Sequence, residues 1–256
     1  MKLLIPKNKL KINRKLKVTF KSIESSYDII QNDLLCNNCS NNNGEIPKTT
    51  WKLQIYLQLV LHRTTDILTD ISWCLENDIL SSSSILIRAL FENITILYDS
   101  MISIEDAIAE ENIESVNEHL NRMILRTNND PDSPYQAERV EDICDRIAVE
   151  YPSYRSAFDS LSELSHPNYD GMIGLYCKEI FLKKKLIDII KSRKLKHDYM
   201  YSVKVSKVFG FKKDVFSPLI IRLNASLLML IVSYKRYTEM YDRITLLSNK
   251  MKKGAK

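Results

Sequence analysis

Residues 84–101 read SILIRALFENITILYDSM, and as a helix this stretch is apolar on nearly every side. A helix of this kind belongs inside a protein, because it has no polar face to turn toward water. Polar side chains nevertheless recur in and beside it at intervals of three or four residues, which stacks them as one stripe. The members of this polar stripe are Ser81, Ser84, Arg88, Glu92, Thr95 and Asp99. The stripe faces either a solvated cleft or an internal polar network, because burying Arg88 and Glu92 unpaired is costly.

Helical periodicity continues on both sides of this stretch and predicts an all-α protein. The expected helices cover about 19–35, 49–76, 81–101, 104–127, 135–150, 153–166 and 217–248. Thr49 or Thr50 is the expected N-cap of the second helix, since threonine favours that position, and Ser217-Pro218 is expected to open the last one. Together, these expected helices predict an antiparallel helical bundle of six or seven helices, with a short strand-like segment near 199–211.

Composition bounds the domain organisation and excludes several classes of site. With 256 residues, the chain suits a basic leader, helix and asparagine-rich loop over 1–48, followed by a single bundle domain over 49–256. Five glycines are too few for a P-loop or a dinucleotide fingerprint. Five scattered cysteines argue against a disulfide framework, and Cys36 and Cys39 lack a second ligand pair, so no metal and no cofactor are expected.

Charge is strongly segregated along the chain. Residues 1–21 carry eight basic side chains and no acid, residues 101–150 carry thirteen acids and four arginines, and residues 178–213 carry twelve basic groups and three acids. Such segregation is typical of a nucleic-acid surface, but the acidic and basic segments can equally face each other across the fold or a subunit boundary. Both interpretations stay open from the sequence.

A second polar group gathers at the end of the expected helix 153–166. Ser162, Ser165, His166, Tyr169 and Asp170 surround Pro167, which closes the helix. A helix C-terminus stabilises an imidazolium, and histidine titrates near neutral pH, so His166 suits the role of an acid or base. Capping of the last carbonyls is the alternative. Of the other histidines, His62 and His119 are interpreted as helix-surface residues, and His197 lies in the basic run.

Two motifs together resemble a known group of proteins. Arg88-x-x-x-Glu92 on an apolar helix, followed by Leu-Ser-x-x-Ser-His-Pro-Asn-x-x-Gly over 161–171, resembles uncharacterised bacterial all-helical proteins related to HEPN-type ribonucleases of toxin–antitoxin and phage-defence systems. The resemblance covers roughly 50–175 and 215–248. It implies a helical bundle, often dimeric, in which arginine and histidine promote attack of a ribose 2′-hydroxyl without a metal. In HEPN proteins four to six residues separate the two side chains, whereas 78 positions separate Arg88 from His166, so the fold must bring them together.

Three functions follow as competing hypotheses. The first is a metal-independent ribonuclease or a related toxin or defence effector, with Arg88 on the phosphate, Glu92 orienting Arg88 and His166 as acid or base. Its substrate contacts would come from Ser84, Ser162, Tyr169, Lys183, Lys184, Lys185 and Arg193. The second is a non-enzymatic helical scaffold, and the third a nucleic-acid-binding regulator. Expected partners are RNA and a second copy or an antitoxin-like protein, in the cytoplasm and without a membrane span, since Arg222 and Asn224 interrupt the most apolar stretch.

Overall fold

A computed structural model describes residues 14–34, 46–77, 79–127, 132–166 and 213–254. Seven α-helices make up almost all of these described residues, together with one π-helical turn and no strand, so the predicted all-α bundle is confirmed. The helices are α1 (Arg14–Ile29), α2 (Lys48–Glu76), α3 (Leu80–Ala109), α4 (Ile113–Leu125), α5 (Val140–Glu150), α6 (Ser153–Ser165) and α9 (Lys213–Gly254). The π-helical turn Ile30–Leu34 extends α1. The strand-like segment expected near 199–211 lies outside the described residues.

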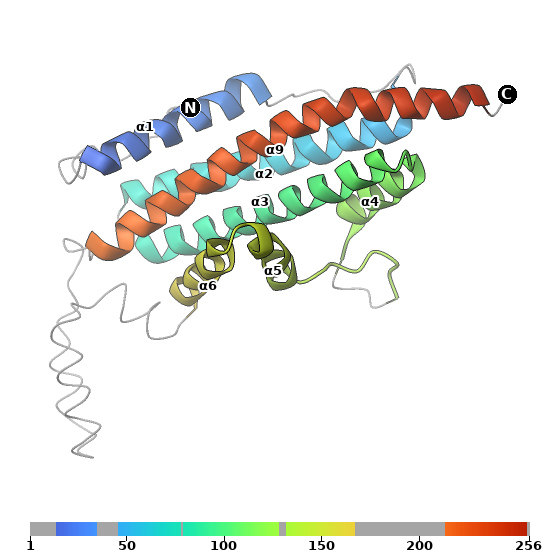
Figure 1. Cartoon of the computed structure of the whole chain (residues 1–256). Helices are drawn as coiled ribbons and strands as arrows, with labels where there is room; N and C mark the ends of the chain where they lie inside the picture. The colour runs from blue at the N-terminus through green and yellow to red at the C-terminus, as the bar shows by residue number, and fades with distance from the viewer. Residues whose placement is uncertain (1–13, 35–45, 78, 128–131, 167–212, 255–256) are drawn as a thin grey trace, which may run out of the picture.

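Three long helices, α2, α3 and α9, run alongside one another and form the body of the bundle (Figure 1). Helix α1 lies along α9 on one side, while α5 and α6 lie against α3 on the other (Figure 1). Helix α4 turns back along α2 and α3, where the ammonium group of Lys52 on α2 donates to Asn117 Oδ1 at 2.7 Å and to Asn121 Oδ1 at 2.5 Å. The short helices therefore cover the faces that the three long ones leave.

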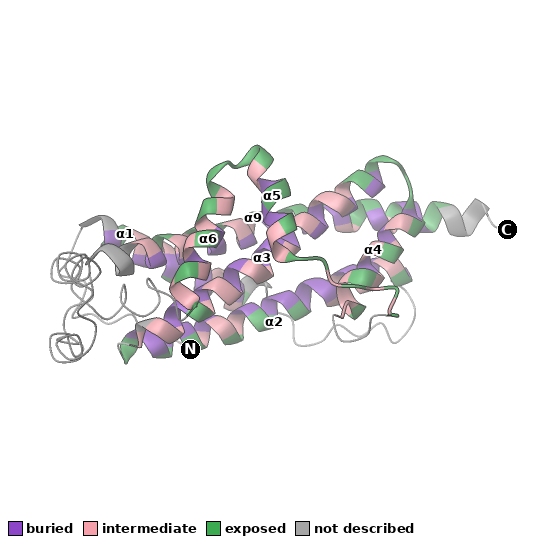
Figure 2. Cartoon of the chain, turned by 90° about the horizontal axis from the view of Figure 1, so that it is seen from below, coloured by how far each residue is buried: buried purple, intermediate pink, exposed green. Residues whose placement is uncertain are grey.

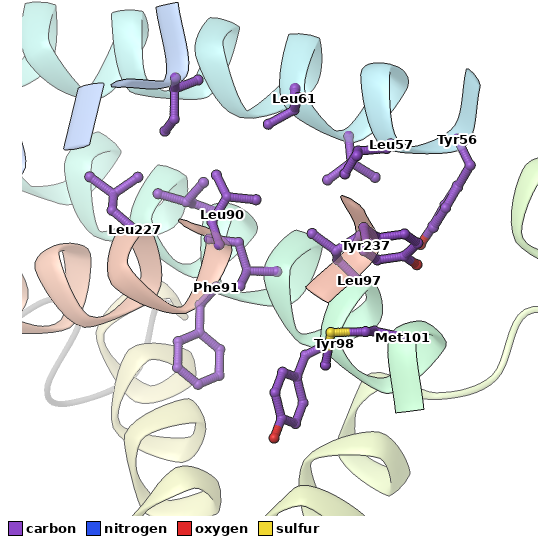
Figure 3. Packing of buried hydrophobic residues seen from close by; sticks show 14 of the residues in the cluster. Tyr56, Leu57, Leu61, Leu90, Phe91, Leu97, Tyr98, Met101, Leu227 and Tyr237 are labelled. Carbon is purple, nitrogen blue, oxygen red and sulfur yellow. The ribbon is translucent and has the colours of Figure 1, made fainter. Parts of the chain in front are cut away.

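The core consists of the apolar faces that these helices turn toward each other, seen as buried residues along α2, α3 and α9 in Figure 2. Leu61, Leu90, Leu97 and Leu227 are fully buried within it, and Figure 3 shows their packing. Helix α1 contributes Phe20, Ile23 and Tyr27 to the same cluster, so the helix of the basic leader shares the core of the bundle. Burial of an apolar side chain stabilises the fold by roughly 1.5–3 kcal/mol each, before the entropy of ordering the chain is subtracted.

The break between the third and fourth expected helices lies at a different place. A break was predicted near 101–104, but α3 runs on to Ala109, because nothing there interrupts the helical backbone. The chain turns instead at Glu111, whose φ of 54° is left-handed, and the Asn112 side chain caps α4 by accepting from the Ser115 amide at 3.0 Å. Asparagine is a preferred N-cap, so Asn112 is the sequence signal that was missed.

Two predicted helix starts are wrong. Helix α2 begins at Lys48 with Pro47 in the cap position, and no side chain caps it. Thr50 is buried instead and lies 3.2 Å, oxygen to oxygen, from the hydroxyl of Thr245 on α9. Helix α9 begins at Lys213, so Pro218 lies inside the helix rather than opening it. A proline this close to the helix start removes few backbone hydrogen bonds, which is why the helix tolerates it.

Helix α9 is also the helix among the described residues that is long and apolar enough, over Pro218–Lys250, to cross a membrane by length and composition. Its most apolar window has a mean hydropathy of 1.3, and 39% of that window is buried inside the bundle. A core helix of a soluble protein meets the same two criteria, so this feature is weak evidence for a membrane span. In the bundle, α9 packs as a core helix along the side that faces α1, α2 and α3.

Candidate functional site

The polar stripe of α3 is the surface on which α5 and α6 dock. Ser84, Arg88, Thr95 and Asp99 each bond to a group of the segment 138–166. Of the two expected alternatives, the stripe is therefore mainly a polar network between helices, and parts of it, including Arg88 and Glu92, also reach solvent. This arrangement explains how a helix with an apolar surface on its other sides carries charged residues at regular spacing.

The central contact of the stripe joins Arg88 to His166. The Nη1 atom of Arg88 lies 3.2 Å from Nε2 of His166, across 78 positions of sequence, and the contact is exposed to solvent. Helix α6 ends at Ser165, and the His166 amide donates to the Ser162 carbonyl oxygen at 3.1 Å, which holds the histidine in the cap position over α3. The expectation that folding brings Arg88 and His166 together is confirmed.

Arg88 is held from two further sides. Its Nε donates to Glu92 Oε1 at 2.8 Å, and its guanidinium carbon lies 5.4 Å from the centre of the Phe158 ring on α6. The side chains of Arg88 and Glu92 are 23% and 30% exposed, so this pair is partly desolvated but open to small molecules and ions. Glu92 and Phe158 therefore orient the guanidinium, while Nη1 faces the imidazole at the surface.

The Arg88–His166 contact needs an acceptor on the imidazole. A guanidinium has only donors, so the hydrogen bond forms when Nε2 of His166 is the acceptor, in the tautomer that carries its proton on Nδ1. An anion between the two side chains can accept hydrogen bonds from both, because its oxygens are acceptors. The pair therefore offers a place for the oxygens of a phosphate or a carboxylate.

Farther along the stripe, Thr95 is fully buried and bonds to Tyr154 of α6. The Thr95 hydroxyl lies 2.7 Å from the Phe91 carbonyl oxygen and 2.8 Å from the Tyr154 hydroxyl. Since its one proton goes to the carbonyl, Tyr154 donates to Thr95. Burial raises the pKa of Tyr154 well above its usual value, so the phenol stays protonated. The Tyr154 ring also packs on Phe91 with centroids 4.7 Å apart, which makes this a structural contact.

The stripe ends in an ion-pair network at Asp99. Arg146 of α5 donates from Nε and Nη2 to the Asp99 carboxylate, with nitrogen–oxygen distances of 2.9–3.1 Å, and its Nη1 bonds to Glu138. The hydrogen bond from Arg146 lowers the pKa of the Glu138 carboxyl below its usual value, against the opposing effect of burial. Both carboxylates are thus committed to Arg146, which ties α5 and the segment before it to α3.

Several residues that the sequence placed in the site have other roles. Ser84 was expected to bind substrate, but it is fully buried and its hydroxyl is shared between the carbonyl oxygens of Ser81 at 2.8 Å and Leu164 at 3.3 Å. Ser84 therefore positions the end of α6 and cannot touch a substrate. The Ser162 hydroxyl oxygen is buried as well and has no hydrogen-bond partner among the described residues. Tyr169, Lys183, Lys184, Lys185 and Arg193 lie outside the described residues.

A second histidine contact was not foreseen. His119 on α4 was interpreted as a surface residue, yet its Nε2 lies 3.0 Å from the hydroxyl of Ser100 on α3, to which Tyr237 of α9 donates at 3.3 Å. Burial lowers the pKa of His119 below its usual value of 6.5. Ser100 is fully buried, so this group is a structural network. The missed signal is Ser100 itself, a polar residue of α3 outside the polar stripe, which needs a hydrogen-bond partner when it is buried.

No group of three or more His, Cys, Asp or Glu side chains within the described part of the chain is placed so that it could hold a metal ion. The groups present at the Arg88–His166 cluster are the guanidinium, the imidazole and the Glu92 carboxylate. Together they can bind an anion, accept a proton at Nε2 and return it. Comparison of the chain with protein-family models, with curated proteins and with solved structures found no match in any of the three.

Proposed function

We propose that the protein cleaves RNA without a metal ion at the cluster of Arg88, Glu92 and His166. The observation that carries the proposal is the 3.2 Å approach of a guanidinium and an imidazole at an exposed edge, between helices that are far apart in sequence. The resemblance of the two motifs to HEPN-type proteins points to the same chemistry. The cytoplasmic location and the role as a toxin or defence effector belong to this proposal.

Arg88 would bind the scissile phosphate. Guanidinium binds phosphate through paired hydrogen bonds, and Arg88 is already oriented by Glu92 and by the Phe158 ring, so little freedom is lost on binding. Its Nη1 atom, now directed at His166, would turn its hydrogen bond to a phosphate oxygen. The guanidinium then stabilises the extra negative charge of the pentacoordinate transition state, which is the largest contribution available at a site without a metal.

His166 would serve as the base. In the tautomer with its proton on Nδ1, the Nε2 atom is an acceptor, so it can take the proton of the ribose 2′-hydroxyl as the 2′-oxygen attacks phosphorus. The new 2′-oxygen–phosphorus bond replaces the bond from phosphorus to the 5′-oxygen of the next nucleotide, and that oxygen takes a proton from water. The hydroxide that remains takes the proton back from His166. The products are a 2′,3′-cyclic phosphate and a 5′-hydroxyl. Lys183, Lys184, Lys185 and Arg193 stay predicted contacts to the RNA backbone.

The proposal is tested with full-length protein, labelled single-stranded RNA and excess EDTA. We expect cleavage that EDTA leaves unchanged, with cyclic phosphate ends. His166→Ala and Arg88→Ala should each lower the rate by about a hundredfold or more, because each removes one of the groups that act in the transition state. His62→Ala and Arg243→Ala, which change exposed residues elsewhere, serve as matched controls and should cleave like the wild type.

A structural role for the cluster is the second candidate, favoured by the fact that Arg88 already has Glu92, His166 and Phe158 as neighbours. In that case neither the wild type nor His166→Ala cleaves RNA, and Arg88→Leu lowers the free energy of unfolding. Binding of RNA that weakens steeply with salt, without cleavage, would instead point to a nucleic-acid-binding regulator. The same variants, measured for cleavage, binding and unfolding, separate the three functions.

A further inference from the structure

A pocket of about 280 Å³ opens to solvent between α2 and α3, next to the ends of α4 and α5. Its volume lies close to the lower limit of small-molecule sites, about 300 Å³. Apolar side chains form part of its lining, with Leu59 on α2, Ala89 and Ile96 on α3, and Met123 on α4, while the larger share of its exposed surface is polar. The apolar part suits the apolar or aromatic body of a small ligand, because the ligand removes that surface from water, and the polar part suits a charged group.

Two arginines line the same pocket from different helices. Arg63 is exposed on α2, and Arg126 is half-buried in the cap position after α4. Within the described residues, neither guanidinium has a carboxylate oxygen within 4.0 Å. Some other arginines of the bundle do have such partners, as Arg146 has Asp99 and Arg155 has Asp145. Two guanidiniums without such partners beside one cavity favour binding of an anion there.

The position of Arg126 is fixed by the backbone that follows it. The Thr127 amide donates to the Tyr135 carbonyl oxygen at 3.0 Å, and the Ala137 amide donates to the Thr127 carbonyl oxygen at 3.2 Å. These two bonds close the loop between α4 and α5 beside the pocket. On the opposite wall, the Asn93 amide donates to the Thr64 hydroxyl at 3.0 Å, which joins α3 to α2 one residue after Arg63. Both arginines therefore extend from backbone that is held in place.

The acidic groups nearby are already committed to other arginines. Glu92 lines the pocket, but its carboxylate accepts from Arg88 Nε at 2.8 Å. Glu138 lies close enough to Arg126 for the guanidinium to contribute to the lowered pKa of its carboxyl, yet its hydrogen bonds go to Arg146. The charges of Arg63 and Arg126 are therefore left for a ligand. A phosphate dianion matches two guanidiniums in charge, and its oxygens accept hydrogen bonds from guanidinium groups.

We propose that this pocket binds a small organic phosphate, with the phosphate on Arg63 and Arg126 and an apolar or aromatic body between Leu59, Ile96 and Met123. The site is separate from the Arg88–His166 contact, with which it shares only Glu92 as a neighbour. The proposal does not rest on RNA cleavage. A ligand there contacts α2, α3 and the ends of α4 and α5, so it stabilises the folded protein by binding only to it.

The test uses phenyl phosphate as the probe, with isothermal calorimetry and thermal melting of the full chain. We expect phenyl phosphate to bind and to raise the melting temperature, and inorganic phosphate and phenol to bind at least tenfold more weakly, because each lacks one half of the ligand. Arg63→Ala and Arg126→Ala should each weaken binding by about tenfold to a hundredfold, since each removes charged hydrogen bonds. Ala89→Met keeps both charges but fills the cavity, and should weaken binding similarly.

The control variant is Arg243→Ala, which changes an exposed arginine on α9 and should bind phenyl phosphate like the wild type. Phenyl phosphate should bind in this way even if the protein cleaves no RNA, so the proposed phosphate pocket and the proposed RNA cleavage can fail independently. Phenyl phosphate that does not bind at millimolar concentration would overturn the inference. So would binding that Arg63→Ala, Arg126→Ala and Ala89→Met leave unchanged, or inorganic phosphate that binds as tightly as phenyl phosphate.

Discussion

Arg88 and His166 meet with 3.2 Å between Nη1 and Nε2 because α6 is docked on α3 by polar contacts as well as by its buried apolar side chains. Ser84 holds the carbonyl end of α6, and Thr95 holds Tyr154 near its start. On the other side of α6, Arg222 of α9 donates to the Ser160 hydroxyl at 2.8 Å. The geometry of the proposed site therefore depends on groups that never touch a substrate.

The Thr95–Tyr154 bond is expected to couple α3 and α6 energetically. Thr95→Val leaves the buried Tyr154 hydroxyl without its acceptor, which should lower the free energy of unfolding by about 1–3 kcal/mol. The double variant Thr95→Val with Tyr154→Phe removes both partners and should cost less than the sum of the single changes. Urea unfolding of the four proteins measures this coupling. Thr238→Val, in which an exposed threonine loses only a bond to its own helix, is the control.

Arg146 is expected to anchor α5 through charge. Arg146→Met removes the hydrogen bonds to Asp99 and Glu138 and should lower the free energy of unfolding by about 1 kcal/mol, because the network is partly exposed. The difference from the wild type should shrink in about 1 M salt, where exposed charges are screened. Arg139→Met changes an arginine that is 75% exposed and whose one ion pair is 3.9 Å long, and should have little effect. Equal losses from both variants would contradict a special role for Arg146.

His119 is expected to make stability depend on pH. Burial lowers its pKa in the folded protein below 6.5, so the unfolded chain binds a proton first as the pH falls. The contribution of the neutral ring is fully present above about pH 6.5 and is lost as the pH falls toward the lower folded pKa, by at most about 1.4 kcal/mol per pH unit. Urea unfolding between pH 7.5 and 5.5 should show a smaller loss for His119→Gln than for the wild type.

His62 provides the comparison for this pH effect, because it is exposed on α2. Its variant His62→Gln should keep the wild-type dependence on pH. If His119→Gln and the wild type lose the same stability over this range, the expectation that burial lowers the pKa of His119 is contradicted. Ser100→Ala should not abolish the pH dependence, because it removes only the hydrogen-bond partner and leaves the partly buried ring of His119 in place.

Cys144 is expected to be inert in the folded protein. The side chain is fully buried, and burial raises the pKa of the thiol to about 12, so almost no thiolate is present at pH 8. Iodoacetamide should leave Cys144 unmodified in native protein and modify it after unfolding in urea, as read by peptide mass spectrometry. Rapid native labelling of Cys144 would show that α5 opens readily from α3.

The sequence predicted more of the fold than of the site. Apolar periodicity placed α2 through Glu76 and α6 from Ser153 correctly, because the spacing of buried side chains is a local property of a helix. It missed the turn at Glu111 and the cap at Asn112, because short polar loops leave few signals. The periodicity identified the polar stripe of α3, but the prediction that Ser84 binds substrate was wrong. Spacing shows which residues share a face of a helix and not what covers that face.

Local chemistry in the chain thus determined that these residues form long helices with apolar faces, and that one buried helix carries a row of polar groups. Only the tertiary structure decided that α6 covers this row, that its terminal histidine reaches Arg88, and that Arg63 and Arg126 border one pocket. The physical reason is that helix formation follows from neighbours within about four residues. The meeting of side chains 78 positions apart depends on how whole helices pack against one another.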